Sequence, residues 1–489
     1  MQARDVRYDG RFFTCVKTTG IYCRPVCPAR PPKLENCTFV PTAAAAQAAG
    51  FRPCLRCRPE SSPDLDAWRG TSATVSRALK MIEGGALDEG DVESLAARLE
   101  IGERQLRRLF RQHIGAAPVT VAQTRRVLLA KQLLHQTDLS MIEVALASGF
   151  GSVRRFNETF QGLYHRPPSE LRRRAATPSP SPEISLLLPY RPPYDWDAML
   201  RFLQKRAITG LEVVTADTYS RVIELRGVTG SVSVAHAPDQ SALRVAVRFP
   251  RLDALPVIIA RLRRMFDLSA DPGAIAAVLA SDPILAPLVT ARPGLRVPGA
   301  WDGFEVAVRA VLGQQITVTA AIRLASRIVA TIGTPVTHST AIPGLTHAFP
   351  PPQRFDAHAL AKLGMPRARA TALAGVAAAV IADPRLFDPR RDLAEAVARL
   401  CQLPGIGEWT AQYIAMRALG ESDAFLAGDV AVQRKFTSNG KRPTAAELLA
   451  HAERWRPWRA YAVLHLWMAA ADAPQSLQSK KKTYHALAT

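Results

Sequence analysis

The chain lacks any apolar run that approaches the roughly 20 residues of a membrane-spanning helix. Its segment Met1 to Gly10 is polar and charged. We therefore expect a cytoplasmic protein with no membrane partner. Acidic residues are also scarce, because 42 Asp and Glu stand against 63 Lys and Arg, which makes the formal net charge +21. This balance favours a polyanionic partner such as nucleic acid.

Cysteine is almost absent outside the first 58 residues, where six of the seven cysteines lie. In a reducing compartment such clustering indicates metal or thiolate chemistry rather than disulfides. Cys15 and Cys37 have no closely spaced partner, and we expect them to be small buried residues. The distant Cys401 is expected in the core. No cysteine follows it, which excludes a cysteine-ligated iron–sulfur cluster after the hairpin described below.

Two short-spaced pairs, Cys23-Arg24-Pro25-Val26-Cys27 and Cys54-Leu55-Arg56-Cys57, stand in this first region. Four thiolates can close tetrahedrally around one Zn²⁺, and a segment of this length needs such support to fold. The simpler interpretation is a structural zinc site. A zinc-bound thiolate also remains a nucleophile, so the spacing leaves open whether the site does chemistry. Nearby arginines, Arg24 and Arg30 among them, suit a DNA backbone.

A repeated pattern fills residues 74–174, which we expect to be helical throughout. Asp91 to Leu99 and Met141 to Phe150 each precede a turn and a basic helix, the order of a helix-turn-helix. In the two basic helices the apolar residues are expected to pack in the core: Leu106, Leu109, Phe110, Phe156 and Phe160. The polar residues are candidate contacts to bases or phosphates: Arg104, Gln105, Arg107, Arg108, Ser152, Arg154, Arg155 and Asn157.

A Pro/Ser-rich linker, residues 175–183, marks the main domain boundary. Beyond it the pattern predicts a small α+β unit over residues 184–290. Its expected strands are 184–189, 218–227, 231–234 and 243–249, and its expected helices are 196–207 and 254–266. Residues 291–475 read as helical, and 476–489 as a tail.

The most informative stretch is a predicted helix, hairpin and helix. Residues 394–401 and 408–419 read as helices, and Leu403-Pro404-Gly405-Ile406-Gly407 between them cannot continue either one. Leu403, Gly405 and Gly407 are candidate DNA contacts, because a hairpin that opens a helix presents unpaired N–H groups to a phosphate. Asp429 follows as a lone carboxylate. The alternative is an ordinary helix-turn-helix corner with a solvated aspartate.

Three family resemblances cover most of the chain. Thr18 to Arg30 and Ala49 to Cys57 resemble the N-terminal domain of the Ada methylation-response protein. That likeness implies that Cys23 accepts a methyl group from a DNA methylphosphotriester, with Cys27, Cys54 and Cys57 as further zinc ligands. Loss of one thiolate charge should then strengthen DNA binding, a hypothesis that equal affinities before and after methylation would refute. The repeat resembles the AraC-type DNA-binding domain.

Residues 184–475 look like AlkA-type 3-methyladenine DNA glycosylases of the helix-hairpin-helix family, with Val311 to Ile316 and Trp455 to Ala462 among the matching segments. The likeness implies that Asp429 is the catalytic carboxylate. It assigns the pocket that binds the flipped base to three aromatic residues, with two glutamines on the loop that enters the gap in the DNA: Trp409, Tyr413, Trp467, Gln314 and Gln315. Relatives that also nick the sugar carry a lysine at the position of Trp409, so we predict a monofunctional glycosylase.

The sequence therefore predicts a mainly α, multidomain protein. Its expected parts are a zinc domain, a double helix-turn-helix, an α+β subdomain and a glycosylase domain, over residues 1–60, 71–174, 184–290 and 291–475. The expected partners are double-stranded DNA, as alkylated bases, methylphosphotriesters and promoter sites, and RNA polymerase. No Pro-Cys-His-Arg motif is present, which disfavours direct O6-methylguanine repair. The alternative is a transcription factor whose glycosylase half only binds DNA.

Overall fold

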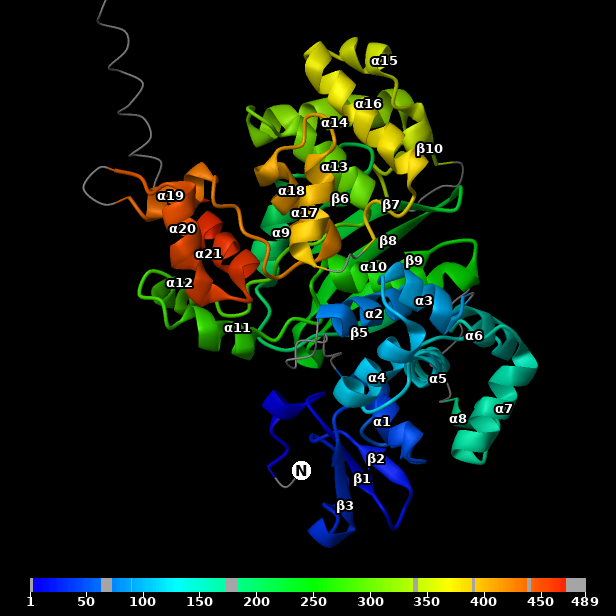
Figure 1. Ribbon diagram of the computed structural model, residues 1–489. Coiled ribbons are helices and arrows are strands. Elements are labelled where there is room, and N and C mark those ends of the chain that lie inside the picture. Colours follow the sequence, from blue (N-terminus) through cyan, green and yellow to red (C-terminus); the bar gives the residue numbers. More distant parts are fainter. Residues whose placement is uncertain are drawn as a thin grey trace, which may run out of the picture.

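The computed structural model describes residues 3–62, 73–88, 90–172, 183–336, 342–388, 392–437 and 441–471 (Figure 1). Residues 175–182 of the predicted linker and the predicted tail, 476–489, lie outside these ranges. The chain is mainly helical and contains several structural units, which confirms the predicted fold class. None of its described helices combines the length and the apolar character that a membrane span requires.

The N-terminal unit is a small four-stranded sheet with the strand order β3-β1-β2-β4 and one helix against it. Strand β1 pairs antiparallel with β2 and β3, and β2 pairs parallel with β4. The elements are β1 (Phe13–Val16), β2 (Ile21–Cys23), β3 (Cys37–Val40), α1 (Ala43–Ala48) and β4 (Arg52–Pro53). The largest side chains of its apolar cluster are Phe13 and Tyr22. A core this small fits the expectation that the segment depends on a metal.

The next unit consists of helices only, which confirms the helical prediction for this region. They are α2 (Ala73–Glu83), α3 (Val92–Arg98), α4 (Glu103–Ile114), α5 (Pro118–Gln136), α6 (Met141–Ala147), α7 (Val153–Tyr164) and α8 (Pro168–Leu171). Side-chain caps mark the starts of α3 and α6, since Asp91 accepts from the amide of Ser94, and Ser140 forms a capping box with Glu143. Gly149 makes the turn before α7 with a φ of +86°.

A five-stranded antiparallel sheet with the order β5-β9-β8-β7-β6 follows. Its elements are β5 (Ile184–Pro189), α9 (Trp196–Gln204), β6 (Glu212–Val214), β7 (Thr218–Leu225), β8 (Val228–Ala237), β9 (Ala242–Arg248) and α10 (Leu255–Met265). The predicted strands and helices are all present. Of the strands in this sheet only β6 was not predicted, because three residues carry too little alternation to reveal a strand. Helices α11 (Pro272–Leu279) and α12 (Ala286–Ala291), which follow α10, were not predicted either.

The rest of the described chain is helical apart from a short pair of strands, β10 (Thr334–Pro335) and β11 (His347–Ala348), which was not predicted. The first helices are α11 (Pro272–Leu279), α12 (Ala286–Ala291), α13 (Gly303–Leu312), α14 (Val318–Ile332), α15 (Ala357–Ala361) and α16 (Arg367–Ala382). The later ones are α17 (Leu393–Cys401), α18 (Glu408–Ile414), the π-helical turn η7 (Ala415–Leu419), α19 (Val430–Lys435), α20 (Ala445–Ala452) and α21 (Arg459–Ala471).

Cys401 is exposed, so its predicted place in the core is wrong. The buried face of α17 carries Ala396, Val397 and Leu400. Cys401 follows Leu400 by about 100° around the helix, which turns its side chain away from that face.

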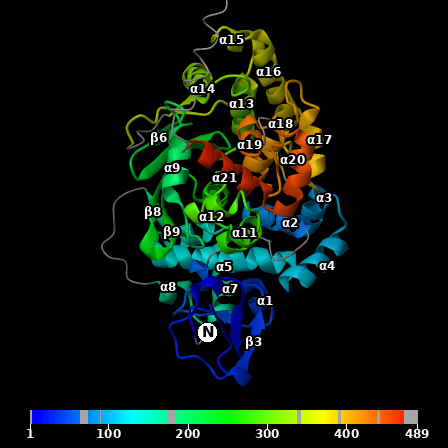
Figure 2. The same cartoon turned by 90° about the vertical axis from the view of Figure 1, so that its left-hand side faces the viewer.

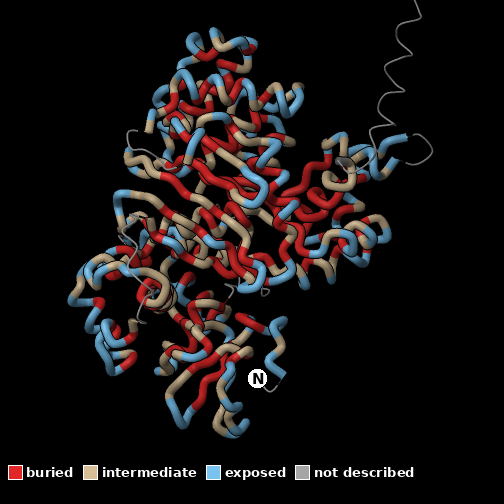
Figure 3. The backbone as a smooth tube through the Cα atoms, turned by 180° about the vertical axis from the view of Figure 1, so that it is seen from behind, coloured by how far each residue is buried: buried red, intermediate tan, exposed pale blue. Residues whose placement is uncertain are grey.

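Helix α5 of the helical unit contacts both the N-terminal unit and the five-stranded sheet (Figure 2). The ammonium of its Lys131 is fully buried and donates to Glu60 at 2.8 Å and to the carbonyl of Cys54 at 3.1 Å. On the other side, Gln132 donates to the carbonyl of Leu187 at 2.8 Å, and the Leu187 amide donates to Gln136 at 3.0 Å. Strand β5 is the edge of the five-stranded sheet, so these glutamines satisfy an edge that would otherwise stay open. Buried residues, red in Figure 3, occur in every one of these units.

Candidate functional site

The carboxylate of Asp429 is held from four directions. Asp429 caps the N-terminus of α19, and its Oδ1 accepts from the amides of Ala431 at 2.9 Å and Val432 at 3.0 Å. The same oxygen accepts from Trp467 Nε1 at 3.2 Å, while Oδ2 accepts from Trp409 Nε1 at 3.1 Å. Two indole donors therefore add to the helix N-terminus in fixing the orientation of this carboxylate.

Three aromatic residues gather beside Asp429. Trp409 and Tyr413 lie one turn apart on α18 and stack with ring centroids 5.4 Å apart and an interplanar angle of 7°. Trp467 comes from α21, and its ring lies 6.4 Å from Tyr413. All three are partly buried and pack on the largest core cluster, so each keeps some surface open to solvent. The structure thus brings together the predicted carboxylate and the predicted aromatic residues.

Arg417 is a member of this group that the sequence reading missed. Its Nη1 donates to the hydroxyl of Tyr413 at 2.6 Å, and its Nη2 donates to the carbonyl of Gly299 at 3.0 Å. Burial would raise the pKa of Tyr413, but the charges of Arg417 and Arg206 outweigh that effect and lower its pKa below the usual value. The i, i+4 spacing of Tyr413 and Arg417 was the available signal.

The hairpin between α17 and α18 depends on Gly405. Its φ is +81°, and a Cβ there would lie 2.7 Å from the Cβ of Ala372. Ile406 is buried beneath the turn, Leu403 is half-buried, and Gly407 is exposed. Both glycines of the turn are exposed, but only Gly405 lacks room for a Cβ.

The two predicted wedge glutamines have different surroundings. Gln314 Nε2 donates to the carbonyl of Gly405 at 2.8 Å and to Thr410 Oγ1 at 3.1 Å, so its amide supports the hairpin. Gln315 is exposed and has a φ of +58°, an uncommon conformation for a residue other than glycine. Of the two glutamines, Gln314 has side-chain hydrogen bonds, whereas the side chain of Gln315 has none to the described residues.

The four predicted zinc ligands come together in the N-terminal unit. The sulfur atoms of Cys23, Cys27, Cys54 and Cys57 all lie within 4.8 Å of one another, and all four residues are buried. A zinc–sulfur bond of about 2.3 Å in a tetrahedron places sulfurs about 3.8 Å apart, so the cluster fits Zn²⁺ with little adjustment.

The arginines near the zinc site differ from each other. Arg24 Nε donates to Asp9 at 2.8 Å, and its Nη1 donates to the carbonyl of Cys57 at 3.1 Å. Its backbone amide also donates to Cys57 Sγ at 3.3 Å. Arg24 thus supports a ligand loop, whereas Arg30 is exposed and open to a DNA backbone.

The second helices of the two helix-turn-helix units present their polar residues to solvent. Leu106 and Phe110 in α4, and Phe156 and Phe160 in α7, are fully buried. The predicted contact residues are all exposed: Arg104, Gln105, Arg107, Arg108, Ser152, Arg154, Arg155 and Asn157. Arg107 pairs with Glu103 at 2.5 Å, and Arg154 with Glu158 at 2.7 Å, both one turn apart on the surface. Such exposed pairs exchange readily for a phosphate partner.

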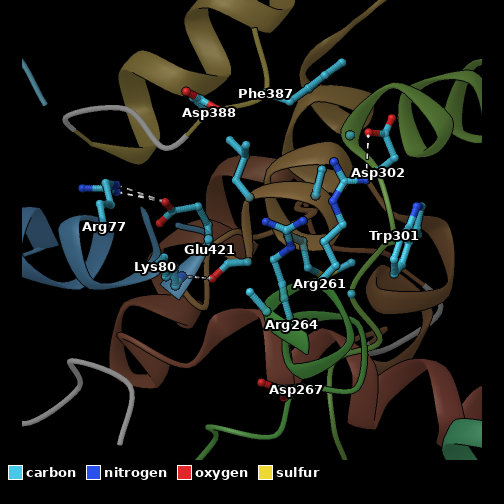
Figure 4. Close-up of a pocket in the computed structure, with 18 of the residues that line it drawn as sticks. Arg77, Lys80, Arg261, Arg264, Asp267, Trp301, Asp302, Phe387, Asp388 and Glu421 are labelled. Carbon is cyan, nitrogen blue, oxygen red and sulfur yellow. Dashed lines mark hydrogen bonds and ion pairs between the residues drawn. The ribbon is translucent and has the colours of Figure 1, made fainter. Parts of the chain in front are cut away.

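A cavity of about 1370 Å³ lies between α2 on one side and β7, α10 and η7 on the other (Figure 4). Its lining includes Arg77, Lys80, Arg261, Arg264 and Asp388. Asp429 and the aromatic residues beside it do not line this cavity. The group around Asp429 therefore lies outside this cavity.

Family comparisons assign three regions. The metal binding domain of Ada matches residues 1–60, a helix-turn-helix domain matches residues 95–174, and the AlkA N-terminal domain matches residues 185–302.

Relatives match both the whole chain and its second half. The chain is 40% identical over 472 residues to the "Probable bifunctional transcriptional activator/DNA repair enzyme AlkA" of Mycobacterium tuberculosis, which covers 96% of this chain and 94% of that protein. "DNA-3-methyladenine glycosylase 2" of Escherichia coli is 35% identical over 57% of this chain and 95% of its own length. The solved 3-methyladenine DNA glycosylase of Archaeoglobus fulgidus, at 22% identity and a TM-score of 0.51, covers 59% of this chain and 98% of that one, and shares its fold.

Proposed function

The chain belongs to the family of bifunctional transcriptional activator/DNA repair enzymes that combine Ada and AlkA parts, and on that basis we propose a division of labour within it. The glycosylase half excises 3-methyladenine and related alkylated bases. The N-terminal half, residues 1–174, senses methylphosphotriesters and activates transcription, and it is called the regulatory half below. The observation that carries the enzymatic part is the carboxylate of Asp429, fixed by Trp409 and Trp467 beside a stacked aromatic pair.

Asp429 suits cleavage of an N-glycosidic bond. As the base leaves, positive charge develops on the sugar, and a carboxylate that is already oriented stabilises that charge without reorganising. Oδ1 accepts three hydrogen bonds, whereas Oδ2 accepts one, from Trp409. Oδ2 therefore has more capacity left to accept a further contact. Oδ2 is accordingly the atom that faces the sugar or orients the attacking water.

The aromatic residues select electron-poor bases. An alkylated purine carries positive charge, so stacking on Trp409, Tyr413 or Trp467 adds a cation–π attraction that a normal base does not gain. The hydroxyl of Tyr413 is engaged by Arg417, which holds the ring in place. Because Trp409 has no amine, the enzyme cannot form a Schiff base and acts as a monofunctional glycosylase.

The hairpin and the glutamine loop bind the DNA around the flipped nucleotide. Leu403, Gly405 and Gly407 lie where α18 begins, and their backbone faces a phosphate of the adjoining strand. Gln315, exposed and without a side-chain partner among the described residues, fills the gap left by the base. Gln314 acts indirectly, since it fastens this loop to the hairpin at Gly405.

The zinc cluster serves as the sensor. Zinc bound by the four cysteines keeps their sulfurs as thiolates. Cys23 Sγ attacks the methyl carbon of a methylphosphotriester, an S–CH₃ bond forms, and the O–CH₃ bond breaks to leave a phosphodiester. The thiolate loses its charge in this step, so repulsion between the domain and DNA phosphates falls.

The helix-turn-helix unit reads the promoter through the exposed side chains of α4 and α7: Arg104, Arg107, Arg108, Arg154, Arg155 and Asn157. An activator bound at a promoter acts on RNA polymerase, which is the protein partner that we propose. Since its substrate and its promoter are both chromosomal DNA, we place the protein in the cytoplasm.

One experiment tests both halves. Full-length protein is incubated with methylated duplex DNA, released bases are separated, and the mass of the Cys23 peptide is measured in the same sample. We expect free 3-methyladenine, a methyl group on Cys23, and no covalent adduct after borohydride. Asp429→Asn should slow base release by about 10² to 10³-fold and still bind the duplex. No base release by the unaltered protein would leave a transcription factor whose glycosylase half only binds DNA.

A further inference from the structure

The second helix of the helix-hairpin-helix unit leads directly to the proposed catalytic carboxylate. Helix α18 continues into the π-helical turn η7, which ends at Gly420 with a φ of +66°. Residues 420–428, called here the aspartate loop, then carry the chain to Asp429. The loop thus joins η7 to Asp429, whose carboxylate accepts from Trp467 on another helix.

Two side chains from the regulatory half hold the start of this loop (Figure 4). Arg77 Nη2 pairs with Glu421 at 3.0 Å, and Arg77 Nε donates to the same oxygen at 3.3 Å. Lys80 Nζ donates to the carbonyl of Gly420 at 3.0 Å. The side chains of Arg77 and Glu421 are only 5% and 14% exposed, so solvent screens this ion pair weakly.

The rest of the aspartate loop is held by the glycosylase half itself. Asp423 accepts from Arg459 Nε at 2.8 Å and from Arg459 Nη2 at 3.0 Å. The amide of Phe425 donates to Gln412 at 3.2 Å, and the carbonyl of Ser422 accepts from the amide of Ala460 at 2.9 Å. Loss of the Arg77 and Lys80 contacts would therefore shift the loop at its beginning without unfolding it.

Helix α2, which supplies these contacts, is packed into the core of the regulatory half. Arg77 and Lys80 lie three residues apart on one face, while Ala78, Met81 and Ile82 are buried with Leu106 in the regulatory core. A third arginine of the same half, Arg98 of α3, pairs with Asp388 at 2.7 Å, shortly before α17 begins. The regulatory half thus contacts the chain on both sides of the helix-hairpin-helix unit.

We infer that Arg77 and Lys80 of the regulatory half are positioning residues for base excision, because they set the start of the loop that carries Asp429. The inference rests on the proposed glycosylase function and extends it: the excision rate of this chain depends on a helix outside the glycosylase half.

The test uses the full-length, zinc-loaded protein. Arg77→Ala, Glu421→Gln and the double variant are compared in single-turnover release of 3-methyladenine, with the affinity for the duplex measured separately. We expect each variant to release base about tenfold more slowly with unchanged affinity, because only the position of Asp429 changes. The double variant should be no slower than either single one, and Arg77→Lys should recover part of the rate.

Arg11→Ala is the control. It removes another ion pair between the two halves, Arg11 with Asp271 at 2.6 Å, which does not touch the aspartate loop. This variant should release base at the unaltered rate. A normal rate for Arg77→Ala, or an equal loss in Arg11→Ala, would overturn the inference.

Hydrogen exchange separates this inference from the glycosylase proposal, because it needs no substrate. Arg77→Ala should exchange the amides of residues 421–429 faster than the unaltered protein, and Arg11→Ala should not. Faster exchange in a protein that releases no base would support the structural link and refute the enzymatic function. Equal exchange in Arg77→Ala and the unaltered protein would refute the link itself.

Discussion

At the scale of single residues, the decisive feature is the set of hydrogen bonds to Asp429. An aspartate on a loop is ordinarily solvated, but here both carboxylate oxygens accept from tryptophan indoles. Trp409 is 20 residues away in the chain and Trp467 is 38 residues away, so neither contact belongs to a local motif. These bonds restrict the carboxylate to one orientation before any DNA arrives, as preorganised catalysis requires.

Trp467→Phe should expose the value of that orientation. An aromatic ring remains at this position, but Oδ1 of Asp429 loses one donor, and we expect base release to slow about tenfold because a hydrogen bond to a charged group contributes about 1.5–3 kcal/mol. Single-turnover kinetics measure it. Trp196→Phe is the control, since the indole N–H of Trp196 has no hydrogen-bond partner within the described residues. A full rate in Trp467→Phe would contradict the assigned role.

At the scale of elements, the helix-hairpin-helix unit combines strong local signals with one long-range constraint. The Pro-Gly-Ile-Gly sequence ends α17 at Cys401 and starts α18 at Glu408, within a residue or so of the predicted bounds. The contact of Gly405 with Ala372 on α16 was not visible in the sequence, because it depends on how two helices pack. Gly405 is therefore required twice, for its φ and for its missing Cβ.

Gly405→Ala should lower the free energy of unfolding of the glycosylase half by about 1–2 kcal/mol and weaken DNA binding, since a Cβ at this φ is strained and meets the Cβ of Ala372. Thermal unfolding and duplex affinity report the two effects. Gly407→Ala is the matched control for stability, because its φ is −87° and no atom lies within 4 Å of the added carbon. Equal melting temperatures for the two variants would rule this explanation out.

At the scale of the whole molecule, buried ion pairs connect the units. Glu305 of α13 pairs with Arg221 of β7 at 2.6 Å and with Arg309 at 2.7 Å. Arg309 in turn pairs with Glu212 of β6 at 2.6 Å. Burial opposes the charged form of Glu305, but its two arginines outweigh burial and lower its pKa to about 2. The five-stranded sheet is thereby bound to the helix that packs beside α18.

Glu305→Gln should destabilise the glycosylase half by about 3 kcal/mol near neutral pH, because the buried guanidinium of Arg221 loses its paired carboxylate and Arg309 keeps only Glu212. The pKa of Glu305 is depressed in the folded state, so its contribution is present above the ordinary glutamate value of 4.5 and fades as pH falls toward 2. Thermal melts at pH 7 and pH 3 should show a smaller difference from the unaltered protein at pH 3. A difference that is the same at both pH values would contradict this assignment.

Glu183→Gln is the corresponding control. Glu183 pairs with Arg248 at 2.8 Å, but about a third of each side chain is exposed. The change should alter stability by less than about 1 kcal/mol at either pH, since exposed ion pairs contribute little.

The sequence by itself determined the features that depend on neighbours along the chain. Cysteine spacing indicated the zinc site, period-3.6 patterns and caps located the helices, and two glycines marked the hairpin. These signals are local because hydrogen bonds within a helix, turn chemistry and ligand loops each involve only a few consecutive residues.

Tertiary structure alone decided which faces meet. It placed Trp467 against Asp429 and left Cys401 exposed. It also brought Arg77 of α2 into contact with Glu421, which lies 344 residues away in the chain. It also used Gln132 and Gln136 of α5 to satisfy the edge strand β5. Such contacts depend on how finished elements pack, and a polar residue on a helix surface carries the same local signal whether it faces solvent or a distant partner.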